Sequence, residues 1–197
     1  MKTLHYYFGL ISPFTYLGHD EFVGIVDRDD VKVVYHPINI GTVFAATGGL
    51  PPGKRSPQRQ AYRLGELRRW SERKELPIQM QPKFFPVDES LAARCVLAID
   101  AEGGSPLDFM GRAHRVVWVE DRDLSDVSVV EEILTAAGHD AKAVIARAEQ
   151  DDIVAARDSG TEQAIEAGVF GAPTYVVNEE LLWGQDRLDW VEETLNK

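Results

Sequence analysis

A serine followed by a proline, Ser12-Pro13, comes directly after the first apolar stretch of the chain. Serine is a favoured helix N-cap and proline is favoured in the first turn, so the pair predicts a helix N-terminus beside the Ser12 hydroxyl. Such a hydroxyl can donate a hydrogen bond to an anion, and the helix dipole adds to the stabilisation. Disulfide exchange requires a thiolate, and the turn Ser12-Pro13-Phe14-Thr15 contains no cysteine, so the protein itself cannot be the redox agent there.

Two other roles for Ser12 stay open. It could serve only as an N-cap, as most Ser-Pro pairs before helices do. As a nucleophile it would need a neighbouring base, for which only His5 and His36 remain open possibilities. We favour hydrogen-bond donation to a thiolate from outside the chain. Lowering a thiol pKa from about 8.5 to about 7 requires about 2 kcal/mol, which one charge-assisted hydrogen bond and a helix dipole can supply.

Two further segments have residue types suited to holding a peptide-like ligand. Pro173, which starts a predicted strand after a small residue, is a candidate cis proline, and Ala172 before it would offer its N–H and C=O to an extended backbone. Gln185 and Asp186 open the last predicted helix, where amide groups suit a carboxylate and Asp186 suits an ammonium group. Together these features match glutathione. Alternatively, Pro173 is an ordinary strand-edge proline and Gln185-Asp186 only a cap.

The elements that must position these residues follow a β-α-β, helical, then β-β-α order. Alternating apolar residues predict strands over 4–8 and 31–36, and a hairpin over 174–183. This order predicts an α/β, thioredoxin-like fold with an all-helical domain inserted after the second strand. We expect residues 1–40 and 155–197 to form the thioredoxin-like domain, and residues 41–154 the insert.

N-cap patterns in the middle of the chain predict the starts of several helices. Ser56-Pro57 opens one helix, and Ser128 with Glu131 forms a capping-box pattern at the start of another. Residues 140–168 form one helical stretch, which Gly160 could break or bend.

Composition limits the classes of partner. The 197-residue chain carries a net charge of -11, which argues against nucleic acid, although residues 51–75 hold eight Lys or Arg against three Glu. The single cysteine, Cys95, excludes an intramolecular disulfide, suits a cytoplasmic location, and is expected to be a buried structural residue. We expect no signal peptide and no membrane segment. The five histidines show no ligand spacing, so we expect no metal site.

Four segments carry a resemblance to a known family. They are residues 7–17 around Ser12, residues 41–48, the Gly168–Val177 run with its G-V-F-G-A-P-T sequence, and residues 183–188 with G-Q-D-R-L. Across essentially the whole chain, these segments resemble 2-hydroxychromene-2-carboxylate isomerase, a relative of kappa-class glutathione transferases and DsbA-type oxidoreductases.

The resemblance implies an activity, a cofactor and an oligomeric state. A glutathione thiolate held by Ser12 would add to an unsaturated carbon of the substrate, bond rotation would follow, and its expulsion would give trans-o-hydroxybenzylidenepyruvate. Such a cis-trans isomerase belongs to naphthalene and related aromatic catabolism and is commonly a homodimer. Two alternatives remain: a kappa-like glutathione transferase that releases a conjugate, and a redox-inactive thioredoxin-like binding module.

The resemblance also implies further site residues. Asn39 matches a ligand-contacting asparagine after the second strand, and Arg59 falls where the family commonly has a lysine for the glycyl carboxylate of glutathione. An arginine keeps the charge and adds a fork geometry. An aromatic substrate pocket would be lined by Phe44, Phe84, Phe85 and Trp183, for each of which core packing is an equal alternative.

Overall fold

The computed structural model describes residues 1–197 and contains a four-stranded sheet of order β2-β1-β3-β4. The parallel neighbours β1 (Lys2–Phe8) and β2 (Val31–Pro37) are connected by α1 (Pro13–Val26). The antiparallel strands β3 (Thr174–Val177) and β4 (Glu180–Trp183) complete the sheet. The predicted β-α-β unit and the C-terminal hairpin are therefore confirmed.

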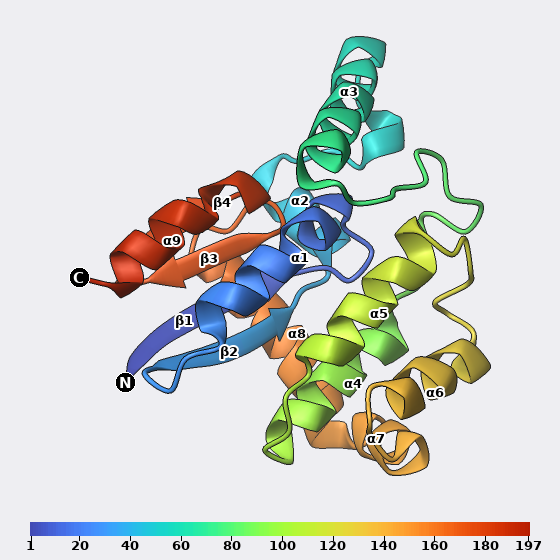
Figure 1. Ribbon diagram of the computed structural model, residues 1–197, viewed down its shortest axis with the longest axis vertical. Coiled ribbons are helices and arrows are strands. Elements are labelled where there is room, and N and C mark those ends of the chain that lie inside the picture. The colour runs from blue at the N-terminus through green and yellow to red at the C-terminus, as the bar shows by residue number, and fades with distance from the viewer.

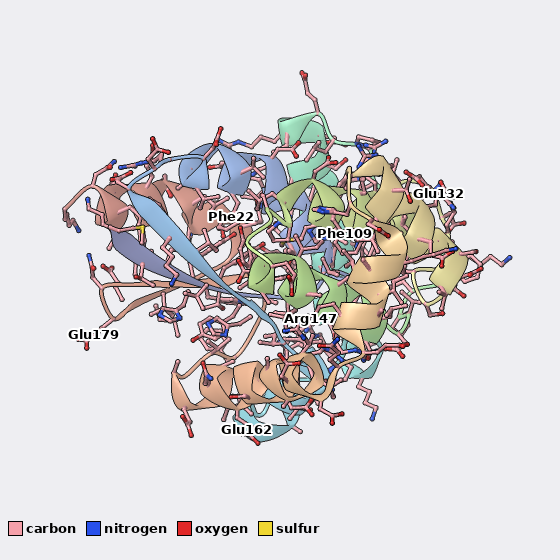
Figure 2. All side chains as sticks on the ribbon, turned by 90° about the horizontal axis from the view of Figure 1, so that it is seen from below. Phe22, Phe109, Glu132, Arg147, Glu162 and Glu179 are labelled. Carbon is pink, nitrogen blue, oxygen red and sulfur yellow. The ribbon has the colours of Figure 1, made fainter.

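Helices cover both faces of the sheet. α1 and α9 (Leu188–Leu195) lie on one face and α8 (Asp151–Glu166) lies on the other (Figures 1 and 2). Because strand side chains alternate, Tyr6 packs on the α1 face, with its ring centroid 4.1 Å from that of Phe22. Its neighbour Tyr7 belongs to a smaller core cluster on the α8 side, together with Ala164.

The helical insert lies beside the sheet (Figure 1). One continuous core of 34 buried residues includes strand residues such as Leu4 and insert residues such as Phe109. The thioredoxin-like part and the insert are thus packed on a shared core, and α5 (Leu107–Trp118) lies against α1. The elements between β2 and α8 are α2 (Ile40–Thr47), the 3₁₀ turn η1 (Pro52–Lys54), α3 (Pro57–Lys74), α4 (Ser90–Ala101), α5 (Leu107–Trp118), α6 (Val127–Ala136) and α7 (Ala141–Ala148).

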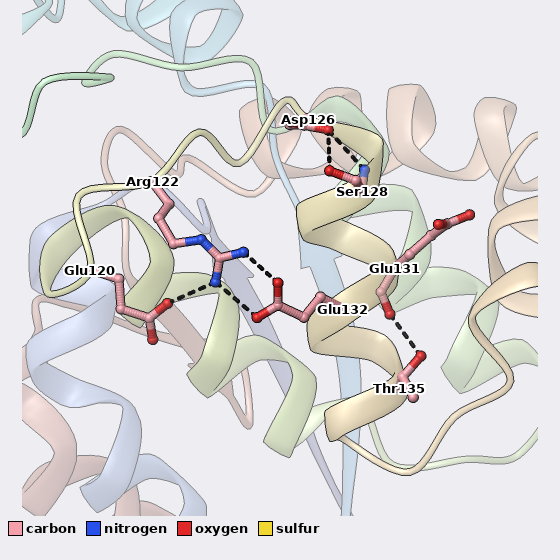
Figure 3. A network of polar contacts seen from close by, with 7 residues as sticks. All are labelled: Glu120, Arg122, Asp126, Ser128, Glu131, Glu132 and Thr135. Carbon is pink, nitrogen blue, oxygen red and sulfur yellow. Dashed lines mark hydrogen bonds and ion pairs between the residues drawn. The ribbon is translucent and has the colours of Figure 1, made fainter.

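Helix α6 begins earlier than its sequence pattern predicts. The N-cap is Asp126 instead of Ser128, and its Oδ1 accepts hydrogen bonds from the Ser128 N–H at 2.9 Å and hydroxyl at 2.8 Å (Figure 3). Upstream, the Arg122 guanidinium bridges Glu120 and Glu132, with contacts of 3.3 and 2.6 Å. The side chain of Asp126, two residues before the expected cap, accepts a bond from one of the first free amides of the helix, which the capping-box pattern alone did not show.

Gly160 does not bend the stretch over residues 140–168. The break falls at residues 149–150, between α7 and α8, and Gly160 lies inside α8. A Cβ at Gly160 would lie 3.5 Å from the His36 ring nitrogen, which is an ordinary van der Waals contact, so α8 packs on β2 here without requiring a glycine. The predicted boundary between residues 154 and 155 lies within the first turns of α8, which contacts both β2 and α4.

Gly18 and Gly24 in α1 give a matched test of packing. A Cβ at Gly18 would approach the Gln185 Cβ to 2.9 Å, whereas one at Gly24 would have no atom within 4 Å. Gly18→Ala is therefore expected to destabilise the protein by about 1–3 kcal/mol through overpacking. Gly24→Ala should stabilise it by about 0.5–1 kcal/mol through helix propensity. Urea unfolding measures both, and equal shifts in the same direction would contradict this packing account.

Candidate active site

Ser12 is the N-cap of α1, as predicted. Its Oγ accepts a hydrogen bond from the Thr15 N–H at 3.3 Å and donates to the Ala172 carbonyl oxygen at 3.4 Å. Both distances are long for bonds to a hydroxyl. The hydroxyl proton therefore has a weak partner inside the chain and can be given to a better acceptor at small cost.

The three segments singled out in the sequence meet at this point. The Ala172–Pro173 peptide bond is cis, and the Pro173 carbonyl accepts a hydrogen bond from the Gly184 N–H at 2.9 Å. Gln185 follows directly and packs against Gly18 of α1. Ser12, the residues before β3 and the residues after β4 thus surround one end of the sheet.

Several backbone amides at this end have no acceptor within the chain. The N–H groups of Ala172, Gln185 and Asp186 make no hydrogen bond to the protein, and Ala172 is only half-buried. Backbone N–H groups are strong donors that are nearly always paired. Their presence beside the Ser12 hydroxyl fits an extended, acceptor-bearing ligand such as a peptide.

Gln185 and Asp186 differ from the predicted arrangement. They belong to a short 3₁₀ turn, η2 (Gln185–Arg187), that precedes α9, because the backbone of Asp186 is not helical. The Gln185 side chain is buried at 2% exposure and its Oε1 has no partner, so only the backbone N–H of Gln185 is available as a donor to a ligand. Asp186 is exposed and its carboxylate lies 2.9 Å from the Arg187 guanidinium.

Asn39 and Arg59 lie on different elements near this end. Asn39 is the N-cap of α2, with its Oδ1 bonded to the N–H groups of Gly41 and Thr42 at 3.1 and 3.2 Å, so its side-chain oxygen is already used. Its side-chain amide N–H groups make no bond within the chain and remain able to contact a ligand. Arg59 lies exposed in the first turn of α3 and has no carboxylate within 4 Å.

The four predicted pocket aromatics fall into separate groups. Phe44 lies beneath the Arg55 guanidinium, and Phe84 lies beneath the Lys83 amine. Phe85 packs on Trp118 with ring centroids 5.0 Å apart. Trp183 is half-exposed and packs against Phe170 with centroids 4.8 Å apart. These residues therefore do not form one aromatic cluster.

Comparison with known proteins identifies the family of the chain. Residues 3–196 match the family described as DSBA-like thioredoxin domain. A 2-hydroxychromene-2-carboxylate isomerase from Sphingobium xenophagum is 31% identical over 98% of both chains. The chain belongs to the 2-hydroxychromene-2-carboxylate isomerase family. A second family member, from Pseudomonas sp. strain C18, is 27% identical over 96% of this chain and 88% of its own.

Solved structures show the same fold. A 2-hydroxychromene-2-carboxylate isomerase structure superposes with a TM-score of 0.80 at 24% identity, covering 98% of this chain and 94% of its own. The cytosolic disulfide reductase DsbM from Pseudomonas aeruginosa, solved with GSH, superposes with a TM-score of 0.68 at 17% identity, covering 99% of this chain and 100% of its own. The predicted thioredoxin-like fold with a helical insert between β2 and β3 is therefore confirmed.

Cys95 is fully buried in this family member, as predicted, and burial raises the pKa of its thiol to about 12. A thiol in that state is neither a nucleophile nor a redox group at neutral pH.

None of the helices is long and apolar enough to cross a membrane.

A buried glutamate beneath the Ser12 loop is the site residue that sequence reasoning missed. Glu89, at the start of α4, is 7% exposed, and its Oε2 accepts a hydrogen bond from the Ile11 N–H at 3.0 Å. A Cβ at Gly9 would lie 3.3 Å from its Oε1, so the loop passes directly over the carboxyl group. Burial raises the pKa of Glu89 to about 7, opposed by the Ile11 N–H and by Arg157. No local motif marks this residue, because only the folding of the insert brings it here.

Glu89→Gln tests this assignment through the pH dependence of stability. The raised pKa of Glu89 means that the folded protein holds a proton which the unfolded chain has lost between pH 4.5 and about 7, so this group makes wild-type stability fall as pH rises. Relative to the variant, the wild-type free energy of unfolding should fall by about 3 kcal/mol across that window, at 1.36 kcal/mol per pKa unit. Urea unfolding at several pH values measures the difference.

The exposed Glu131 provides the control. Glu131→Gln should follow the wild-type pH dependence, since its side chain is in water in both states. Parallel pH curves for wild type and Glu89→Gln would show that Glu89 is not held as a neutral acid.

Proposed function

We propose that this protein is a glutathione-dependent cis-trans isomerase acting on 2-hydroxychromene-2-carboxylate or a related aromatic catabolite, giving trans-o-hydroxybenzylidenepyruvate or its counterpart. The observation that carries the proposal is the Ser12 hydroxyl at the α1 N-terminus, beside the unpaired N–H of Ala172. Family membership supports the reaction class. A cytoplasmic location and a homodimer are part of the same proposal.

The residues at this end of the sheet fit glutathione. The N–H and C=O of Ala172 suit the cysteinyl backbone, the Gln185 and Asp186 amides suit the γ-glutamyl carboxylate, and the exposed Asp186 carboxylate suits its ammonium group. Asn39 and Arg59 are the proposed contacts at the other end, where Arg59 would bind the glycyl carboxylate. When bound, glutathione would supply a thiolate nucleophile that is recovered after each turnover. DsbM, solved with GSH, has the same fold.

Ser12 would act as a hydrogen-bond donor. Its proton would leave the weak bond to the Ala172 oxygen, at 3.4 Å, and point to the thiolate sulfur. A bond to an ionised acceptor contributes about 1.5–3 kcal/mol. That is enough to lower a thiol pKa by about one to two units, at 1.36 kcal/mol per unit. His5 and His36 lie 3.0 Å from each other across β1 and β2, and the structure shows no bond from either to Ser12.

Two alternatives are separated from the isomerase by experiment. A kappa-like transferase would consume glutathione and accumulate a conjugate, whereas the isomerase returns all of it. A redox-inactive binding module would show no glutathione affinity. Product analysis with a glutathione assay distinguishes the three, and stoichiometric loss of glutathione would overturn the isomerase proposal.

Ser12→Ala tests the donor role. The pKa of the bound glutathione thiol is expected to lie near 7 in wild type and to rise by about one unit or more in the variant. Ultraviolet thiolate absorbance as a function of pH measures this directly. The control is Ser56→Ala, which removes the N-cap serine of α3 and should leave the thiol pKa unchanged. An unchanged thiol pKa in Ser12→Ala would remove Ser12 from the proposed chemistry.

Asp186→Asn tests the ammonium contact. Loss of an exposed ion pair should weaken glutathione binding by about fivefold in calorimetry. Asp189→Asn, three residues later on the exposed side of α9, is the control and should bind normally. A glutathione analogue without the α-amino group should bind wild type and Asp186→Asn equally. A full fivefold difference with that analogue would contradict the contact.

A further inference from the structure

We propose that the cavity between α3 and the segment 77–89 is the binding site for a planar aromatic carboxylate, with Arg63 as the residue that recognises the carboxylate. The inference rests on the proposed function, since it identifies where the organic substrate of that reaction would lie. It adds Arg63 and places the pocket around Phe85, one of the four aromatic residues expected from the sequence to contact the substrate.

The cavity has the composition of a small-molecule site. Its volume is about 260 Å³, which is close to the lower end of typical ligand pockets. Phe85, Trp118 and Met80 supply apolar walls, while Gln60, Gln81 and Arg63 supply polar groups. The lining is therefore mixed, with an apolar part that can hold a ring and polar groups that can orient an organic ligand.

Arg63 is a cation with no anionic partner. No carboxylate lies within 4 Å of it, and its guanidinium makes no hydrogen bond within the chain, although it is only partly exposed. By contrast, Arg69 on the same helix pairs with Glu66. Burial, with a smaller effect of Arg55, lowers the pKa of Arg63, because the charged guanidinium is partly desolvated and has no neighbouring anion. A partly desolvated guanidinium gains most from a bidentate carboxylate.

The wall next to Arg63 favours a flat ring. The Arg63 guanidinium lies 5.8 Å from the centroid of Phe85, which itself packs on Trp118. An aromatic ring prefers such surfaces, because offset and edge-to-face contacts between rings add to the area that is buried. A free phosphate or another small inorganic anion would use the charge and leave the apolar walls unfilled.

The segment 77–89 connects this cavity to the Ser12 region. Near its start, the Tyr16 hydroxyl donates to the Pro77 carbonyl at 2.6 Å, and at its end Glu89 accepts from the Ile11 N–H. Both anchors lie on the stretch that contains Ser12. Residues of the 80–85 stretch line the cavity and lie between these two contacts. The contacts are made by residues on either side of Ser12, the proposed hydrogen-bond donor to the thiolate.

Arg59 and Arg63 are one helical turn apart and have different surroundings. Arg59 is exposed, as suits the terminal carboxylate of a peptide, whereas Arg63 lines the cavity. Residues four apart lie on the same face of a helix, so Arg59 and Arg63 project from one face of α3. We assign the first to glutathione and the second to the organic acid.

The test uses trans-cinnamate as the probe, with trans-cinnamamide as its neutral counterpart. Calorimetry or ligand-observed NMR is expected to show saturable cinnamate binding to wild type, about tenfold or more weaker binding to Arg63→Met, and weak binding of the amide to both. Arg63→Lys should be intermediate, because it keeps the charge and loses the fork. Arg68→Met, an exposed arginine on α3, is the control and should bind as wild type does.

The outcomes separate this inference from the proposed function. Equal cinnamate affinity in wild type, Arg63→Met and Arg63→Lys, or no binding to wild type, overturns the assignment. Glutathione affinity measured on the same proteins should be unchanged by Arg63→Met. If wild type binds cinnamate through Arg63 and does not bind glutathione, the pocket assignment stands and the proposed function fails.

Discussion

The antiparallel pairing of β1 with β3 is the interaction on which the site depends. Tyr7 pairs with Thr174, so the end of β1 lies beside the start of β3, and Thr174 in turn pairs with Trp183 at the end of β4. The residues that leave β1, enter β3 and leave β4 must therefore meet. A one-residue slip would turn every side chain to the opposite face and would separate these segments.

The helical insert is part of this arrangement as well as of the core. It places the buried Glu89 carboxyl group, whose pKa is raised by burial, under the loop that precedes Ser12, and its helices share one continuous core with the sheet. The buried carboxyl group also explains why the loop approaches so closely at Gly9, where a side chain would crowd the carboxyl oxygens. The insert follows β2 and precedes α8 in the sequence, yet it supplies the residue that supports the loop before Ser12.

Local sequence patterns predicted the features that depend on interactions between neighbouring residues. Alternation identified the strands, and Ser12-Pro13 identified the start of α1, because capping and strand periodicity act over a few residues. The convergence of Ser12, Ala172 and Gln185 followed from the order of elements. Three features depend on tertiary packing and could not be predicted from neighbouring residues: the burial of Gln185, the separation of the four aromatics and the position of Glu89. The division of the chain at residue 154 stays a prediction, as do the ligand contacts.

The segment 77–89 is tethered at both ends, near Tyr16 and at Ile11, and free of regular structure between. Between these ends, the Gln79 N–H donates to the Trp118 carbonyl and the Lys83 N–H to the Asp121 carboxylate, both at 2.6 Å, while the side chains of Met80 and Phe85 line the space beneath α3. Substitutions of the side chains that line this space can thus reshape it while Ser12 keeps its place at the α1 N-terminus. The fold can therefore stay the same while a few residues between two fixed anchor points change the shape of the cavity.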